Sequence, residues 1–314
     1  MLDIFRLEEG RLILLPPDAM VTTMDNHWFE MVDPTPAELQ QVQALCSEPL
    51  PDVEEIEELE ASSHHLVFEQ GFQSNCLFFY RPEGEPNNFN VSFLYNQNGL
   101  ITISLVELPH FRLLHIRNRK LVDLFSDTLS IFFALLEIKV DGLADEMEQS
   151  YRELEAISNR VLGRKQSDLD EAIDGLAAQE DLVGKVRLCL MDGQRDIRFI
   201  MRQPMVNKRL RKVANELLAD IQTIMPHNDF LSEKADFLLN ATQGFIVMEQ
   251  NRIMKIFSVT ALIFLPPTFI AAIYGMNFQF MPELSQPWGY PAALAVMLLA
   301  AGGPFLYFKL KKWL

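Results

Sequence analysis

A short loop near the C-terminal end of the chain contains residues that could hold a hydrated cation. Gly275, Met276 and Asn277 follow Tyr274, and the Asn277 amide offers a carbonyl oxygen without a charge. A ring of such oxygens suits Mg2+, which dehydrates reluctantly and is bound with several waters in place. We expect Gly275 to let the chain leave the preceding helix, because glycine has no Cβ penalty there. Loop capping is the ordinary alternative for an isolated Gly-Met-Asn.

A stripe of mainly polar and small residues precedes this loop. Its seven members follow alternating steps of three and four, the seam of helices packed around an axis. They are Asn251, Met254, Ser258, Ala261, Leu265, Thr268 and Ala272. Such a face could simply mediate helix packing in a membrane. Alternatively it lines a pore, with Leu265 and Met254 as apolar constrictions and Thr268 and Asn251 offering oxygens. Two spans cannot enclose a pore alone, so this interpretation requires a homo-oligomer.

Two apolar segments flank the loop, and each is close to the roughly 20 residues that span a bilayer. We expect transmembrane helices at 256–274 and 290–308, an external loop at 275–289 and a basic tail at 309–314. Bases flank the outer ends of both spans and the loop has none, so the positive-inside rule places both termini in the cytoplasm. Pro266 and Pro267 predict either a kink beside the pore or a tolerated bend.

The remainder of the chain is strongly acidic. Of 43 acids and 27 bases, only Glu283 and five bases follow residue 250, which leaves the first 250 residues with a net charge of −20. This charge argues against a nucleic-acid partner and suits cations, although plain solubility explains it equally well. Three scattered cysteines fit a reducing cytosol. The histidines form no catalytic constellation, so we do not expect an enzyme.

Residues 1–118 are expected to form a cytoplasmic α+β domain. Helices are predicted at 35–46 and 53–62, and Asn96 to Gly99 predicts a hairpin turn. The predicted strands are 11–15, 27–32, 66–69, 76–81, 90–95 and 100–105.

Residues 119–255 are expected to form long helices and a stalk. Amphipathic patterns predict helices at 121–162 and 169–203, and a shorter helix at 208–224 that ends before Pro226. From Pro226 to Tyr274 a continuous helix would extend about 73 Å, so part of it should project from the roughly 30 Å bilayer core into the cytoplasm. Such a stalk could transmit movement or act as a rigid spacer.

The loop and its flanks resemble the CorA family of magnesium transporters, most closely its enterobacterial type. The resemblance rests on the run Tyr274 to Leu284 (YGMNFQFMPEL), on Gly289-Tyr290-Pro291, on the ending Lys312-Trp313-Leu314 and on residues 250–267. It extends more loosely through the whole chain. It implies a funnel-shaped homopentamer in a bacterial inner membrane that passes Mg2+, Co2+ and Ni2+ inward. It also implies an outer selectivity ring of Gly275, Met276 and Asn277, above a pore lined by Asn251, Met254, Ser258, Leu265 and Thr268.

Two features of this chain bear on what the resemblance implies. Gln279 stands where the family often has Glu, which leaves Glu283 as the acid that attracts cations outside. Family members sense internal Mg2+ through acids between subunits, and the candidates here lie on or near the stalk. They are Glu216, Asp220, Asp229, Glu233 and Asp236. A solvated helix face explains each of them equally simply.

We therefore expect a divalent-cation channel or transporter that takes up mainly Mg2+ and is gated by intracellular Mg2+. A double charge moving through roughly 100 mV gains about 4.6 kcal/mol, so membrane potential alone can drive uptake. No Walker loop is present, so ATP is not an expected partner. Mg2+ is the expected cargo and regulatory ligand, with no organic cofactor. The alternatives are a zinc-transporting relative with the same Gly-Met-Asn motif, or a membrane-anchored signalling or scaffold protein.

Overall fold

The computed structural model describes residues 1–16, 19, 21–51, 65–96, 98–121, 125–163, 166–277, 279 and 281–311. The chain divides into two compact units, Met1–Leu239 and Asn240–Leu314. The helix predicted at 53–62 and the ending Lys312-Trp313-Leu314 lie outside the described residues. The finer domain boundaries expected near residues 118 and 255 stay predictions.

A seven-stranded sheet forms the first part of unit Met1–Leu239, in the order β2-β1-β3-β7-β6-β5-β4. β3 and β7 pair in parallel and the other neighbours pair antiparallel. The strands are β1 (Leu2–Glu8), β2 (Arg11–Leu14), β3 (His27–Val32), β4 (His65–Val67), β5 (Gly71–Tyr80), β6 (Asn87–Asn96) and β7 (Gly99–Ser104). Six of them overlap the predicted strands, whereas β1 was not predicted. The hairpin is confirmed, because Asn96 pairs with Gly99 across β6 and β7.

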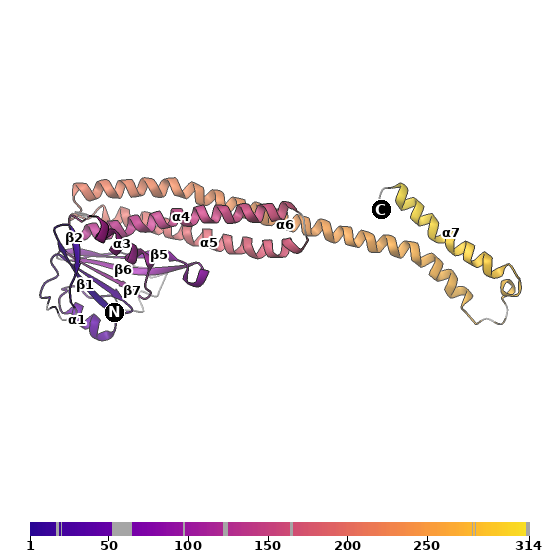
Figure 1. Ribbon diagram of the computed structural model, residues 1–314, viewed down its shortest axis with the longest axis horizontal. Helices are drawn as coiled ribbons and strands as arrows, with labels where there is room; N and C mark the ends of the chain where they lie inside the picture. Colours follow the sequence, from indigo (N-terminus) through magenta and orange to yellow (C-terminus); the bar gives the residue numbers. More distant parts are fainter. Residues whose placement is uncertain are drawn as a thin grey trace. The chain divides into compact units, whose positions relative to one another are not determined.

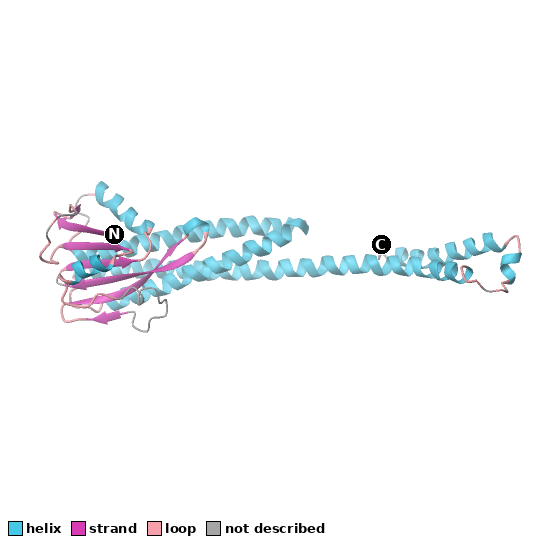
Figure 2. Ribbon diagram, turned by 90° about the horizontal axis from the view of Figure 1, so that it is seen from below, coloured by secondary structure: helices cyan, strands magenta, loops and turns pink. Residues whose placement is uncertain are grey.

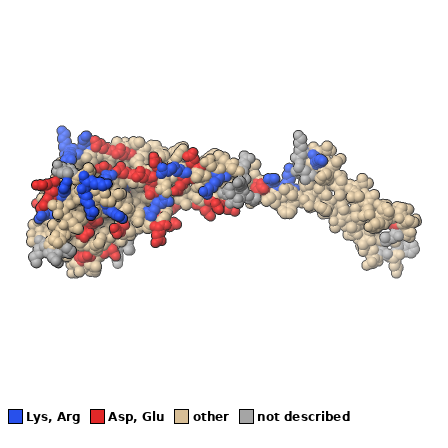
Figure 3. Space-filling model, viewed as in Figure 1, with Lys and Arg blue, Asp and Glu red and all other residues tan. Residues whose placement is uncertain are grey.

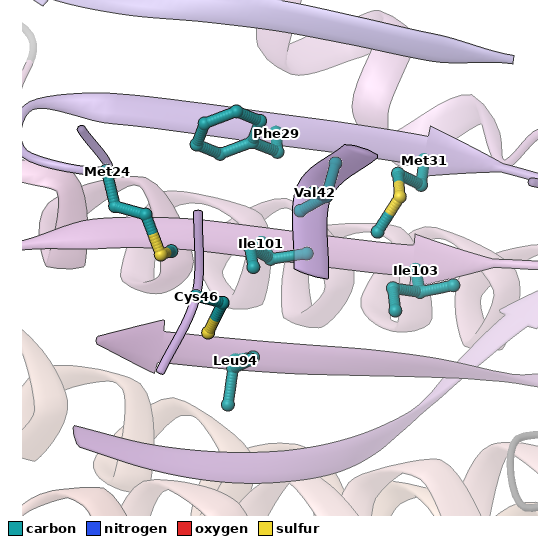
Figure 4. Close-up of a cluster of buried hydrophobic side chains, with 8 residues drawn as sticks. All are labelled: Met24, Phe29, Met31, Val42, Cys46, Leu94, Ile101 and Ile103. Atoms are coloured by element: carbon teal, nitrogen blue, oxygen red, sulfur yellow. The ribbon is translucent and has the colours of Figure 1, made fainter. Parts of the chain in front are cut away.

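Helix α1 (Pro36–Gln43) covers one face of this sheet. Its start matches the predicted turn, because the Thr35 hydroxyl accepts the Glu38 N–H and the Glu38 carboxylate accepts the Thr35 N–H. Alternate residues of the central strands point to this side, as the pleat requires. The buried cluster beneath α1 consists of Met24, Phe29, Met31, Val42, Cys46, Leu94, Ile101 and Ile103 (Figure 4).

Three helices, α3 (Pro109–Lys120), α4 (Thr128–Gly163) and α5 (Gln166–Ile200), belong to the layer on the other face (Figure 1). The Trp28 indole N–H donates to the Thr102 hydroxyl at 3.0 Å, and Phe93 meets Phe132 of α4 edge to face at 4.7 Å. The predictions of α4 and α5 are confirmed. The short, base-rich α3 was not predicted, because its apolar residues give only a weak helical pattern.

Helix α6 (Lys208–Tyr274) runs through 67 residues, so the prediction that a helix ends before Pro226 was wrong. Proline removes the N–H that would bond the carbonyl four residues earlier. Pro226 and Gln222 are both exposed, so water can bond the Gln222 carbonyl in place of that N–H. The helix also continues through Pro266 and Pro267.

A buried cluster of charged side chains joins α4 and α5 to strand β5. Lys139 and Asp196 are 1% and 0% exposed, and Lys139 Nζ lies 3.3 Å from Asp192 Oδ2. Asp192 Oδ2 also accepts the Leu77 N–H at 2.7 Å, which fixes the helix to the strand. Asp196 Oδ1 accepts a long bond of 3.4 Å from the Ser74 hydroxyl and lies 3.7 Å from His65 Nε2, while its Oδ2 has no hydrogen-bond partner among the described residues.

One lysine cannot neutralise two buried carboxylates, and the second carboxyl group therefore keeps its proton. Burial, and then the negative charge of Asp192, raise the pKa of Asp196 well above its ordinary value, against the opposing effect of Lys139. Burial is the largest effect on Lys139 and lowers its pKa, but Asp192 and the other acidic groups around it together outweigh burial and raise that pKa. The cluster thus holds a neutral Asp196 beside a Lys139–Asp192 ion pair.

The variant Asp196→Asn should become more stable than the natural chain as pH rises. The unfolded chain loses the Asp196 proton above an ordinary aspartate pKa, whereas the folded chain retains it, so natural stability falls with pH up to the folded pKa. The amide has no such proton, and the difference should grow by up to about 1.4 kcal/mol per pH unit in that range. Melting temperatures of the full chain between about pH 5 and about pH 8, followed by circular dichroism, measure it.

Asp192→Asn is the matched control, because it removes the carboxylate that Lys139 contacts. We expect it to destabilise the fold at every pH, by up to about 3–5 kcal/mol for a broken buried pair. An Asp196→Asn variant that loses stability equally at all pH values would contradict the assignment of the proton to Asp196.

Candidate functional site

Two apolar helices make up most of unit Asn240–Leu314. Helix α7 (Gly289–Leu310) returns beside the C-terminal part of α6 (Figures 1 and 2). Both helices are long and apolar enough to cross a membrane, and only 6% of each apolar window is buried. The visible surface of this unit carries few charges, unlike that of the sheet and its helices (Figure 3). Leu298 and Leu299 are 74% and 76% exposed, a pattern typical of a surface covered by lipid or another chain.

The C-terminal part of α6 has one covered and one uncovered face. Val259 is 3% exposed, and Ile263, Pro266, Pro267 and Ile270 are partly buried at helical spacing. All seven residues of the stripe predicted from the sequence are exposed. They are Asn251, Met254, Ser258, Ala261, Leu265, Thr268 and Ala272. At 100° per residue the stripe lies well away from the covered face, so the chain itself leaves it without a partner.

The hydroxyl of Thr268 is oriented by its own helix. Thr268 Oγ1 donates to the Phe264 carbonyl at 2.7 Å, the bond that Ser and Thr commonly make to the preceding turn. Its hydrogen is thus engaged, and the oxygen presents lone pairs to the stripe. Thr260, which lies off the stripe, makes the same bond to the Ile256 carbonyl at 2.8 Å. The two threonines differ in the face that they occupy.

The loop residues lie at the end of α6. The Gly275 N–H donates to Ala271 O at 2.9 Å and the Met276 N–H to Ile273 O at 3.2 Å, so the last turn closes with backbone bonds. Helix α6 ends at Tyr274, directly before Gly275 as expected, and Gly275 does not adopt positive φ. Met276 is 51% exposed and Asn277 is exposed. Glu283, in the 3-10 turn Pro282–Ser285, is exposed as well.

The five acids considered as regulatory ligands do not come together within one chain. Glu216 lies 3.4 Å from Lys212, and Asp229 Oδ1 lies 2.9 Å from Arg187 Nη1. Helical spacing places Glu216 and Asp220 on one side of α6, and Asp229, Glu233 and Asp236 on roughly the opposite side. Among the described residues, no group of three or more His, Cys, Asp or Glu side chains could hold a metal ion.

Sequence patterns missed the buried cluster of Lys139, Asp192 and Asp196. Its members come from two helices and face Ser74 and Cys76 of β5, so no local spacing connects them. They also missed a group of arginines at the C-terminal end of α5 and in the turn that follows it, whose spacing of three and four residues was visible in the sequence.

The sequence pattern of one protein family, described as CorA-like Mg2+ transporter protein, matches residues 24–311. The chain belongs to the CorA family. It is 42% identical to the magnesium transport protein CorA of Sodalis glossinidius and 40% identical to that of Salmonella typhimurium, over the full length of both proteins in each pair. These names describe transport proteins and not enzymes.

Solved structures of CorA and of a related protein share this fold. The complete CorA magnesium transporter of Methanocaldococcus jannaschii matches with a TM-score of 0.76 at 18% identity, covering 100% of this chain and 99% of that one. The cytoplasmic domain of ZntB from Vibrio parahaemolyticus matches with a TM-score of 0.55 at 12% identity, covering 80% and 98%. The CorA likeness confirms the α+β part, the long helix and the two apolar helices.

Proposed function

We propose that this chain takes up Mg2+ through a pore formed by a homo-oligomer, with Asn277 at the outer entrance. The observation that carries the proposal is the exposed stripe on α6, which holds polar and small residues on a face that α7 does not cover. Full-length identity of 40–42% to proteins named magnesium transport protein supports Mg2+ as the cargo. A homopentamer, as the family resemblance implies, would bring five such stripes around one axis.

In this proposal the ion keeps most of its water along the path. Gly275, Met276 and Asn277 of each subunit form the entrance ring, where amide oxygens bond the hydration shell without a charge that would hold the ion too tightly. Exposed Glu283 raises the local cation concentration. Below the ring, the Thr268 oxygen and the Asn251 amide bond water, while Met254 and Leu265 narrow the path.

The proposal places both termini in the cytoplasm of a bacterial inner membrane, so the potential drives a divalent cation inward. Co2+ and Ni2+ are further cargo candidates, because they have the charge of Mg2+ and also hold their water. Zinc transport is the second candidate, since the family resemblance includes zinc-transporting relatives with the same Gly-Met-Asn motif. The full-length relatives favour magnesium.

Gating by internal Mg2+ requires ligands from more than one chain. The separation of the α6 acids onto two sides supports a site in which one subunit contributes Glu216 and Asp220 and its neighbour contributes Asp229, Glu233 and Asp236. A bound ion would offset repulsion between acidic surfaces and hold the apolar constrictions closed. When the ion leaves, that repulsion would loosen the ring.

Asn277→Ala should lower Mg2+ uptake at least about ten-fold, because the entrance loses its ring of amide oxygens. Uptake is measured in proteoliposomes with an imposed inside-negative potential and in cells that depend on this transporter. Gln279→Ala, which removes another exposed amide of the same loop, is the control and should retain most uptake. Unchanged uptake in Asn277→Ala would refute the entrance ring, and faster transport of Zn2+ than of Mg2+ would favour the second candidate.

Thr268→Val should lower Mg2+ conduction about five-fold, since about 1 kcal/mol is typical for one lost hydrogen bond. Thr260→Val is the matched control, because it removes an equivalent bond to the preceding turn from a residue off the stripe. Conductance in planar bilayers distinguishes the two. Equal effects would mean that the helix, and not the pore, depends on these hydroxyls.

Neutralising the α6 acids should make the channel less sensitive to internal Mg2+. The variant with Asp229→Asn, Glu233→Gln and Asp236→Asn should need about ten times more internal Mg2+ for half-inhibition, because the ion loses carboxylate ligands. The control, Asp145→Asn with Glu148→Gln, changes exposed acids on α4. Patch recordings of flux against internal Mg2+ measure the shift, and identical inhibition curves would exclude these residues as the sensor.

A further inference from the structure

A cavity beside the C-terminal end of helix α5 has three arginines and no acid among the described residues that line it. It measures about 310 Å3 and lies where α5 passes strand β4. Arg195, Arg198 and Arg202 line it, together with His65 of β4 and Gln194. Arg195 and Arg198 are three residues apart on one side of α5, and Arg202 follows in the turn after the helix ends at Ile200.

These arginines differ from the others around them. All three are exposed, and among the described residues none of them makes an ion pair. Arg187 on the same helix lies 2.9 Å from Asp229, and Arg160 and Arg81 lie near Glu171 and Glu146. Among the described residues that line this cavity, no acid offsets the charge of the three arginines.

The charge of the cavity is opposite to that of the protein. The chain has 43 acids and 27 bases, and three other cavities of the first unit have Asp141, Glu30 or Glu153 on their walls. Three guanidinium groups around one cavity repel one another, because like charges that lie close together are destabilising. A counter-charge from outside the described residues would remove that repulsion.

The donors of the cavity suit a phosphate group. Guanidinium groups present planar forks of N–H donors that bind phosphate oxygens in pairs. The His65 ring stacks on Phe199 at 4.2 Å with an angle of 7° between the planes, which fixes the imidazole at the edge of the cavity. Nucleic acid is a poor candidate, because the surrounding body is strongly acidic and the cavity is small.

We propose that Arg195, Arg198 and Arg202 form a binding site for a small phosphate-bearing anion, either free phosphate or a phosphate monoester. The site reaches the interior of the fold through His65, whose Nε2 lies 3.7 Å from Asp196 Oδ1 and whose Nδ1 lies 3.1 Å from the Ser74 hydroxyl. Anion binding therefore acts next to the charged cluster that joins α5 to β5. This inference is independent of the proposed Mg2+ path.

Isothermal titration calorimetry on the purified full chain in detergent, without Mg2+, tests the site with inorganic phosphate and with glycerol 3-phosphate. We expect saturable binding of at least one of them, weakened at least ten-fold in Arg198→Gln and in Arg195→Gln. Tighter binding of inorganic phosphate identifies the free anion as the ligand, and tighter binding of the ester identifies a phosphorylated metabolite.

Arg152→Gln is the control, because it removes the same charge from an exposed arginine on α4. Melting temperatures of all variants show whether each remains folded. Three results would overturn the proposal: no saturable binding of either probe, equal weakening by Arg152→Gln, or the same heat from chloride at equal ionic strength. In the first case the counter-charge comes from elsewhere in the chain or from a neighbouring subunit.

Discussion

Helix α6 can be covered by its own chain on one face only, and the rest of the protein depends on this constraint. In unit Met1–Leu239 its buried residues, such as Leu217, Ile221, Leu231 and Leu238, form a stripe at steps of three and four. In unit Asn240–Leu314, Val259 and its neighbours form the covered side. A membrane helix that leaves Asn251, Ser258 and Thr268 uncovered needs another chain or water against them, because lipid cannot bond their polar groups.

In unit Met1–Leu239 the long helices α4 and α5 are attached to the sheet by both apolar and charged contacts. Aromatic packing contributes to the contact, with Trp28, Phe93 and Phe132 buried between the layers. The ion pair of Lys139 and Asp192 fixes the position of α5 along β5, because Asp192 also accepts the backbone N–H of Leu77. Burying an ion pair of this kind costs desolvation free energy and in return favours one packing arrangement of helix and strand. A protonated Asp196 keeps a third charge out of the interior, which limits the desolvation cost. The same joint is where the arginine-lined cavity lies.

Sequence patterns located most elements but not all of their limits. Strand β3 and the start of α1 were predicted closely, because alternation and a capping box are local signals. Strand β1 and helix α3 were missed, since they are stabilised by pairing with β3 and packing on α4, and these contacts are not visible in the local pattern of either segment. Pro226 was misinterpreted as a helix end, because a local rule cannot tell that Gln222, whose carbonyl loses its helical partner, lies on the exposed side of α6.

The sequence by itself determined the two apolar spans, the Gly275-Met276-Asn277 loop between them and the spacing of the stripe on α6, because length, charge and helical period are properties of consecutive residues. Only the tertiary structure decided which face of α6 the chain covers, that the stripe stays exposed and that the α6 acids do not meet within one chain. It alone brought Lys139, Asp192 and Asp196 against β5, and His65 beside Arg198. Those neighbours come from separate segments, and their proximity follows from packing, which no local pattern encodes.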